Sequence, residues 1–303
     1  MNSKIDKVYF EIFKKHFPDL KSEEVKALFE GNDHWVFVVK DKTFRFPKAP
    51  REIDPKRATF LKKFASSSPL PLPLIEIYRD EETGINYEIN DFIHGISFYH
   101  DIAETFNKEE LLAVAQKLGE FLSSVHAFPI DEARKLNVDE MNPTDFWAYM
   151  EQNENAYPKF KREIFPYISD NEQKWIEKLF TDYISMIKEE PFKTMVIHSD
   201  MWVYHIIVDP KKHALSGVID FGPRIADPAN DFKAFEYYGS EFVKEVYKNY
   251  SLPVDENFEK RRLFYTGHDE VFELARQVER GNQERITDQK TSLSDYIADH
   301  PFK

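Results

Sequence analysis

The sequence predicts an α+β protein of two lobes, in which a small antiparallel sheet precedes a larger and mostly helical part. The chain has 303 residues, about twice the length of an ordinary domain. Two apolar runs, Trp35–Val39 and Thr43–Phe46, flank a short charged turn, which is typical of two antiparallel strands. After Gly95, apolar residues recur mostly with helical spacing. We therefore expect an N-terminal lobe over residues 1–93 and a C-terminal lobe over residues 94–303, with a cleft where they join.

The N-terminal lobe is expected to combine helices with two pairs of strands. Residues 4–30 carry a helical stripe of apolar side chains that approaches Gly31. A charged helix is expected over Asp54–Phe64. Three prolines at alternate positions then favour an extended connector, because proline disfavours helix at the residue before it. Residues 74–80 and 86–93 follow as two more strand-like segments.

The C-terminal lobe is expected to be helical apart from three short strands. Asn107 and Glu110 form a capping-box pattern that begins a helix, which ends before Pro129. The apolar runs MVIH, HIIVD and SGVID predict the strands. Further helices are expected near residues 143–166, 170–189, 229–250 and 256–281.

Composition narrows the classes of function. The formal net charge of −13 argues against a protein that binds nucleic-acid phosphates, which needs clustered Lys and Arg, and favours a cationic partner. The absence of cysteine excludes disulfides, thiolate metal sites and cysteine nucleophiles, and it fits a cytoplasmic location. The sequence contains no run typical of a signal peptide or a membrane span. We expect a cytoplasmic protein with no nucleic-acid or membrane partner.

The chemistry is carried by residues 198–232, HSDMWVYHIIVDPKKHALSGVIDFGPRIADPANDF. Asp200 lies on a loop after an apolar run, and Asp220 ends a later one. Phosphoryl transfer to a hydroxyl needs a carboxylate near the nucleophile and oxygen ligands for a magnesium ion that bridges the nucleotide phosphates. We therefore expect Asp200 to be the catalytic base and Asp220 to bind magnesium. His205 is the expected second ligand, although imidazole is softer than magnesium normally prefers.

Three other residues of this stretch are expected to support the structure. His198 precedes Asp200 by two positions and is expected to brace the loop through its ring nitrogens. Asp227 and Asp231 stand at the start of a helical pattern, where a carboxylate caps free N–H groups and favours the positive end of the helix.

The blocks HSDMWVYHIIVD and GVIDFGPRIADPANDF resemble the HxDxxxxH/N and IDxxxxxxxDPxxDF motifs of the aminoglycoside phosphotransferase family. The segments EGNDHWVFVV, FRFPK and LPLPLIEIY are similar to it as well, so the resemblance spans residues 29–250. His205 and the EGND and FPK runs are most similar to aminoglycoside 2''-phosphotransferases, with macrolide 2'-phosphotransferases second. The resemblance implies a two-lobed protein-kinase-like fold, Mg²⁺, and ATP or GTP as the phosphoryl donor. The nucleotide-binding residues that it implies are Gly31, Arg45, Asp91 and Ile93.

Two positions depart from the kinase-like pattern. Arg45 stands where these folds carry a lysine that contacts the nucleotide phosphates, and arginine has the same charge but a different shape. The glutamate that normally pairs with that lysine falls at or near Arg57, so Glu52 or Asp54 would have to replace it. Macrolide kinases can carry arginine at the first of these positions, which favours them slightly.

The substrate is expected to be an aminoglycoside, whose positive charges need several carboxylates facing the cleft. The candidates for these carboxylates are Glu236, Glu241 and Glu270. Two alternatives stay open. One is the same chemistry on a macrolide or on an endogenous metabolite, with aromatic side chains such as Tyr237 lining the pocket. The other is a binding protein without catalysis, which the departures at Arg45 and Arg57 would allow.

Overall fold

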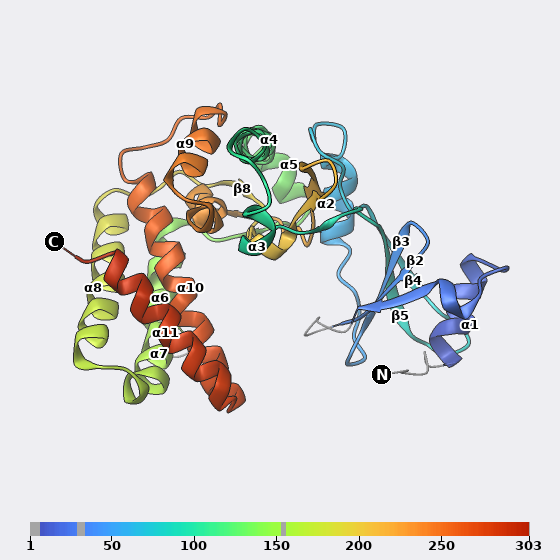
Figure 1. Ribbon diagram of the computed structural model, residues 1–303, viewed down its shortest axis with the longest axis horizontal. Helices are drawn as coiled ribbons and strands as arrows, with labels where there is room; N and C mark the ends of the chain where they lie inside the picture. Colours follow the sequence, from blue (N-terminus) through green and yellow to red (C-terminus); the bar gives the residue numbers. More distant parts are fainter. Residues whose placement is uncertain (1–6, 29–33, 153–155, 303) are drawn as a thin grey trace.

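The computed structural model describes residues 7–28, 34–152 and 156–302, and it has the two expected lobes (Figure 1). The N-terminal sheet and its helix form one end of the molecule. The helices after residue 100 form the centre and the other end. The expected α+β class and the two-lobed arrangement are therefore confirmed.

The N-terminal sheet has five strands in the order β1-β2-β3-β5-β4, and all neighbours are antiparallel. The strands are β1 (Val25–Leu28), β2 (His34–Val39), β3 (Lys42–Pro47), β4 (Ile75–Arg79) and β5 (Asn86–Asp91). Helix α1 (Lys7–His16) packs on one face of the sheet, and the 3₁₀ turn η1 (Ser22–Glu24) leads from it into β1. The smaller of two hydrophobic cores lies between helix and sheet and includes Ile12, Phe13, Phe37, Phe44 and Phe46.

The helical stripe expected over residues 4–30 is wrong in its second half. Helix α1 ends at His16, shortly before Pro18, which has no N–H with which to continue a helix. Residues 25–28 instead form β1 and pair with β2 at the edge of the sheet. The two patterns were hard to separate because this segment is short and only half apolar.

Helix α2 (Lys56–Phe64) belongs by packing to the larger core. Its buried residues Phe60 and Phe64 make ring contacts with Phe128 and with Phe221, the residue that follows Asp220. The orientation of α2 is therefore tied to the segment that carries Asp220.

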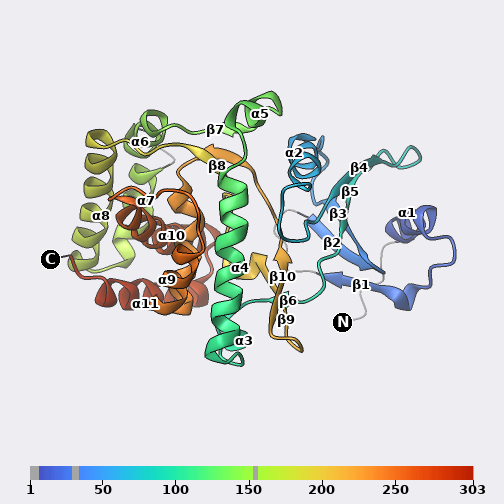
Figure 2. The ribbon, with the colours of Figure 1, turned by 90° about the horizontal axis from the view of Figure 1, so that it is seen from above.

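The chain passes between the lobes after β5 and then pairs with a C-terminal strand. Strand β6 (Ile96–Ser97) lies antiparallel to β9 (Ile206–Asp209), which in turn pairs with β10 (Ala214–Val218). Figure 2 shows these strands between the N-terminal sheet and helix α4 (Lys108–His126). The two lobes are thus joined beside the strands that flank the expected chemistry.

Gly95 permits this connection. Its φ is +146°, and a Cβ there would lie 2.3 Å from the carbonyl oxygen of Val208. We expect Gly95→Ala to lower the free energy of unfolding by about 3 kcal/mol, because strain and a clash with rigid backbone add together. Gly84→Ala is the matched control, since Gly84 also has positive φ but its Cβ would meet only the tip of Arg79 at 3.9 Å. Urea unfolding would contradict the prediction if both variants lost the same stability.

The remaining elements form the C-terminal lobe around the larger core. The helices besides α4 are α3 (His100–Ala103), α5 (Ile130–Lys135), α6 (Pro143–Gln152), α7 (Tyr157–Ile164), α8 (Asp170–Glu189), α9 (Ser240–Lys248), α10 (Phe258–Arg280) and α11 (Gln283–Asp299). The 3₁₀ segments are η2 (Phe165–Tyr167), η3 (Val203–His205) and η4 (Pro228–Tyr238). The strands besides β6, β9 and β10 are β7 (Asp139–Glu140), β8 (Met195–Ile197) and β11 (Arg224–Ala226), which form a small sheet of their own.

Most expected elements of this lobe are confirmed. The capping box of α4 is present, with the Glu110 N–H donating to Asn107 Oδ1 at 3.0 Å. The helix expected near residues 229–250 is divided into η4 and α9 at Gly239. Helix α11 was not predicted, because its sequence is polar and its fully buried residues are only Ile286 and Leu293. Within the described residues, no helix is both long enough and apolar enough to cross a membrane.

Candidate active site

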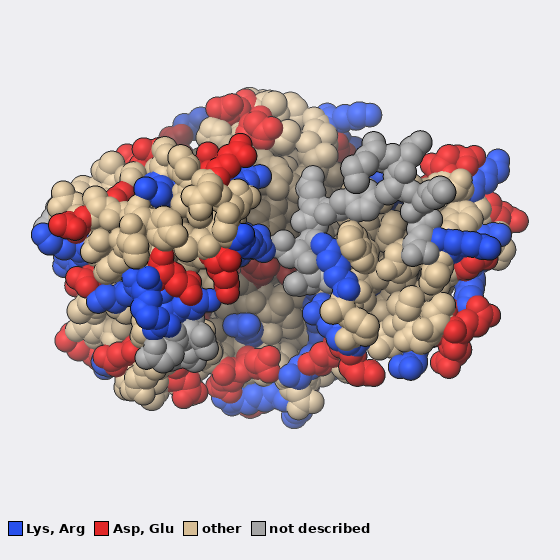
Figure 3. Space-filling view, turned by 90° about the horizontal axis from the view of Figure 1, so that it is seen from below, with Lys and Arg blue, Asp and Glu red and all other residues tan. Residues whose placement is uncertain are grey.

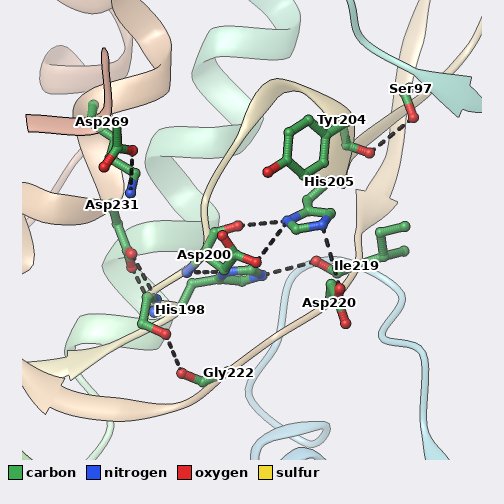
Figure 4. A network of polar contacts seen from close by, with 12 residues as sticks. Ser97, His198, Asp200, Tyr204, His205, Ile219, Asp220, Gly222, Asp231 and Asp269 are labelled. Carbon is green, nitrogen blue, oxygen red and sulfur yellow. Dashed lines mark hydrogen bonds and ion pairs between the residues drawn. The ribbon is translucent and has the colours of Figure 1, made fainter. Parts of the chain in front are cut away.

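Main-chain hydrogen bonds hold the loop that carries Asp200 in an uncommon conformation. Ser199 has φ +71°, which few residues other than glycine adopt. The N–H groups of His198 and Ser199 donate to the two carboxylate oxygens of Asp231, at 2.6 and 2.9 Å. The Ser199 hydroxyl donates to the Gly222 carbonyl, and the Gly222 N–H donates to the His198 carbonyl at 3.0 Å. The loop is thereby fixed to the segment around Gly222 (Figure 4).

His198 braces this loop as a neutral, fully buried imidazole. Its Nε2–H donates to the Ile219 carbonyl at 3.1 Å, and its Nδ1 accepts from the Asp200 N–H at 3.2 Å. A second proton on Nδ1 would face that N–H and lose the bond. Burial is the main reason that the pKa of His198 is lowered to about 4.

This lowered pKa predicts a loss of stability in mild acid. Between about pH 6.5 and about pH 4 the unfolded chain binds a proton at His198 and the folded protein does not, so the free energy of unfolding falls as the pH falls. The expected loss is about 3 kcal/mol over that range. Urea unfolding at several pH values should show a shallower pH dependence for His198→Gln. His94→Gln, at an exposed position, should keep the wild-type dependence, and equal slopes for all three proteins would contradict the assignment.

Asp200, His205 and Asp220 come together as expected, with one ligand atom of each lying within 4.8 Å of the others. His205 Nδ1–H donates to the Asp200 carbonyl at 2.8 Å, which leaves the Nε2 lone pair facing Asp220 Oδ2 at 3.5 Å. Two acceptors that face each other at this distance suit a cation between them. Asp220 itself has φ +58°, an uncommon conformation for a residue other than glycine. These donor atoms therefore fit a divalent metal ion.

The Asp200 carboxylate is about half exposed and lies beside His205 and Asp220. Partial removal from water raises its pKa, and the negative charges of Asp220 and Asp269 act in the same direction. The neighbouring His205 ring and the Lys233 ammonium group oppose this rise. A partly exposed carboxylate with a raised pKa is suited to accept a proton from a hydroxyl. Figure 3 shows a hollow between the two lobes.

Two arginines from the N-terminal part of the chain hold Asp220. Arg45 Nη1 on β3 lies 2.9 Å from Asp220 Oδ1, and Arg57 Nη1 on α2 lies 3.1 Å from the same oxygen. Burial would raise the pKa of Asp220, but Arg45, Arg57 and His205 together hold it below its ordinary value.

The carboxylate that faces Arg45 comes from β5. Glu88 is directly opposite Arg45 in the register of β3 and β5, and its Oε2 lies 3.8 Å from Arg45 Nε. Glu52 and Asp54, the candidates from the sequence, lie before α2 and point elsewhere. Glu52 is almost fully exposed and lies 4.0 Å from Arg79, while Asp54 accepts the Lys56 N–H at the start of the helix.

Asp231 and Asp227 both support the structure, but only Asp227 does so as the expected helix cap, because Asp231 binds the Asp200 loop instead. Asp231 is fully buried and accepts from the Asp200 loop and from His126 Nε2, at 3.1 Å. Although burial opposes ionisation, these hydrogen bonds lower the pKa of Asp231. Asp227 caps η4 through the Ala229 N–H and forms a buried ion pair with Arg261 at 2.8 Å.

The expected nucleotide-binding residues lie along the edge where the lobes meet, apart from Gly31, which is outside the described residues. Arg45 points from β3 toward Asp220. Asp91 ends β5, where its carboxylate accepts from Lys42 Nζ at 2.6 Å. Ile93 follows it, and its Cγ2 lies 3.0 Å from the position that a Cβ on Gly217 of β10 would take.

The candidate substrate carboxylates are all engaged by neighbours. Glu241 lies on α9 and pairs with Lys108 at 2.9 Å. Glu236 pairs with Arg262 at 2.5 Å. Glu270 is buried and accepts from the hydroxyls of Tyr237 and Ser292 and from Gln289 Nε2.

Lys233, which was not predicted from the sequence as a site residue, lies near enough to Asp200 for its charge to act on that carboxylate. It is buried, pairs with Asp269 at 2.7 Å and lies over the ring of Trp202 at 5.7 Å. Trp202 in turn contacts Tyr237, and Tyr204 lies next to His205. Lys233 lies two residues after Asp231 in an apolar segment. An isolated lysine in such a segment is the sequence feature that could have marked it as a candidate site residue.

Comparison with known proteins places the chain in a family. A family model described as the phosphotransferase enzyme family (APH) matches residues 24–252. No curated protein matches the chain significantly in sequence.

Solved structures share the fold over nearly the whole chain. The GDP complex of an aminoglycoside 2'-phosphotransferase-IIIa is 21% identical, with a TM-score of 0.82 over 98% of this chain and 99% of that one. A streptomycin-ATP-APH(2")-IIa ternary complex is 19% identical, with a TM-score of 0.66 over 97% of each chain. A macrolide 2'-phosphotransferase type I is 16% identical, with a TM-score of 0.69 over 96% of this chain and 97% of that one.

Three observations are consistent with one family. They are the arrangement of Asp200, His205 and Asp220, the two-lobed fold and the match to the family model. The chain belongs to the phosphotransferase enzyme family (APH) and has a protein-kinase-like fold.

Proposed function

We propose that this protein transfers the γ-phosphoryl group of ATP or GTP to a hydroxyl of a small molecule. The observation that carries the proposal is the convergence of Asp200, His205 and Asp220 at the junction of the lobes. A carboxylate with a raised pKa and a pair of metal-ligating atoms beside it are the parts that phosphoryl transfer to a hydroxyl requires.

Asp200 is the proposed base. The acceptor hydroxyl lies against its carboxylate, the hydroxyl oxygen forms a bond to the γ-phosphorus, and the bond from that phosphorus to the bridging oxygen of the nucleotide breaks. The proton passes to Asp200 and the nucleoside diphosphate leaves. His198 and Asp231 hold the loop so that the carboxylate stays in position.

His205 Nε2 and Asp220 are the proposed ligands of Mg²⁺. When bound, this ion would neutralise charge on the phosphates. The His205 tautomer needed for this role is the one that its bond to the Asp200 carbonyl already selects.

An aminoglycoside is the first candidate for the substrate. The net charge of −13 favours a cationic ligand, and among the similar structures are complexes of aminoglycoside phosphotransferases. In this proposal Glu236, Glu241 and Glu270 would exchange their present partners for substrate amines.

A neutral substrate such as a macrolide is the second candidate, and the contacts around Asp200 favour it. Lys233 lies near the base and pairs with Asp269, so that carboxylate is already engaged and an amine would have to displace the lysine. The three candidate carboxylates already have partners, so an amine would have to displace them. Trp202, Tyr204 and Tyr237 offer aromatic surface to a sugar ring or an apolar macrocycle.

The test is phosphorylation by the purified protein. We expect ATP or GTP with Mg²⁺ to raise the melting temperature, and one class from a panel of aminoglycosides, macrolides and simple sugars to be phosphorylated. Absence of nucleotide binding by calorimetry together with absence of phosphorylation would overturn the proposal. We also propose that the protein acts in the cytoplasm as a monomer. Light scattering of the purified protein would test the monomeric state.

A further inference from the structure

We propose that Arg57 is a second phosphate-binding residue, and that in the nucleotide-free protein Asp220 takes the place of the phosphates between Arg57 and Arg45. The inference rests on the proposed function, because it concerns how the same site receives a nucleotide. Both guanidinium groups lie on Asp220 Oδ1, at 2.9 and 3.1 Å. Two guanidinium groups directed at one carboxylate oxygen bring several N–H donors to one place, where they can bind a second anion.

The charged residues around Arg45 differ from the kinase-like pattern, in which a lysine on a strand pairs with a glutamate on a helix. Helix α2 contributes a cation, Arg57, where that pattern has a carboxylate, and the counter-charge comes from Glu88 on β5. Glu88 lies 3.8 Å from Arg45 Nε and has no hydrogen bond through Oε2. Two guanidinium groups therefore share two carboxylates, one of which, Asp220, is also needed for metal.

Several donors of the two arginines are unused. Arg45 Nε, Arg57 Nε and Arg57 Nη2 are buried and have no hydrogen-bond partner among the residues that the structure describes. A buried donor without a partner costs free energy, so a ligand that accepts hydrogen bonds from these groups would lower that cost. Phosphate oxygens suit the purpose, since a guanidinium binds phosphate through two parallel hydrogen bonds.

An exchange of partners follows from this geometry. Asp220 Oδ1 holds the arginines while Oδ2 faces His205 at 3.5 Å. When nucleotide phosphates take over Arg45 and Arg57, Oδ1 is released and the whole carboxylate becomes available to the metal. Nucleotide and metal should therefore each strengthen binding of the other.

Asp220→Asn separates the two roles of that carboxylate. Without metal, Asp220 competes with phosphate for the arginines and repels it, so its neutralisation should strengthen nucleotide binding about 10-fold. With Mg²⁺, the same change removes a ligand and should weaken binding. A change of sign between the two conditions is not expected for a residue that acts only as a metal ligand.

The experiment is a calorimetric titration with ATP and with GTP, each in EDTA and in Mg²⁺. We expect Arg57→Met to weaken nucleotide binding about 10- to 100-fold in EDTA, and Arg57→Lys to recover part of the loss. Lys56→Met is the matched control, because it removes one positive charge from the neighbouring position, where Lys56 pairs with Asp139. It should change binding less than about 3-fold. In the double variant Asp220→Asn/Arg57→Met, the gain in EDTA should disappear.

Equal nucleotide binding by Arg57→Met and wild type would overturn the inference, as would weaker binding by Asp220→Asn in EDTA. The melting temperature of each variant identifies a loss that comes from unfolding, and Arg57→Lys then serves in place of Arg57→Met. If the wild-type protein bound neither nucleotide in any condition, the proposed function would fail first. Normal binding by the wild type makes the two failures distinguishable.

Discussion

Replacement of Asp200 with asparagine is expected to lower the turnover of the phosphorylated substrate at least about 100-fold, because asparagine keeps the shape of the side chain but cannot take up the proton. The Asp200 loop is held by main-chain N–H groups of His198 and Ser199, so it should keep its conformation in the variant. The contacts of Arg45 and Arg57 do not involve Asp200. Nucleotide affinity should therefore stay nearly unchanged, and the loss should appear in kcat.

Steady-state kinetics and nucleotide titration of the same preparation test this prediction. Asp182→Asn is a suitable control, since Asp182 is an exposed carboxylate on α8 that pairs with Lys178. It should turn over like the wild type. Unchanged kcat in Asp200→Asn would reassign Asp200 to a structural role, and a large loss of nucleotide affinity would place it on the nucleotide side of the site.

Arg261→Met is expected to lower the free energy of unfolding by about 3–5 kcal/mol, the largest effect on stability that we predict. Arg261 is almost fully buried on α10, where Nε donates to Asp227 at 2.8 Å and the two Nη atoms bind Asp255 at 2.7 and 2.8 Å. Methionine fills similar space but leaves the Asp227 carboxylate buried without its cation. Asp227 caps η4, the segment that also carries Asp231 to the Asp200 loop, so catalysis should suffer as well.

Urea unfolding measures this loss, and the neighbouring Arg262→Met is its control. Arg262 is equally buried, but its partners Glu236 and Glu259 are partly exposed and can be hydrated when the arginine is removed. Its loss should therefore be clearly smaller. In the double variant Arg261→Met/Asp227→Asn, part of the stability should return, because no unpaired charge is left in the interior. Equal losses in the two single variants would contradict this account of the buried pair.

Residues 198–232 could be predicted because their chemistry is local. Strands β8, β9 and β10 are short apolar runs. Asp200 follows β8, His205 directly precedes β9, and Asp220 follows β10. Asp200, His205 and Asp220 meet where the β9–β10 hairpin lies beside the loop that follows β8. The hairpin of β2 and β3 and the capping box of α4 were likewise predicted from neighbouring residues.

The elements that were missed depend on distant contacts. Strand β1 has a half-apolar sequence, and its pairing with β2 makes it a strand. Helix α11 has few buried residues, and it is placed by packing against α10. In each case the short-range pattern is compatible with more than one structure, and burial against a remote partner selects between them.

By itself, the sequence predicted the two-lobed class and singled out Asp200, His205 and Asp220, which the structure brings together, because periodicity and motif spacing act over a few residues. The tertiary structure alone decided what surrounds Asp220. Arg45, Arg57 and Glu88 come from β3, α2 and β5, and their charges act on one another only when strand register and helix packing bring them together. The strength of such interactions depends on distance and burial, which no local pattern records.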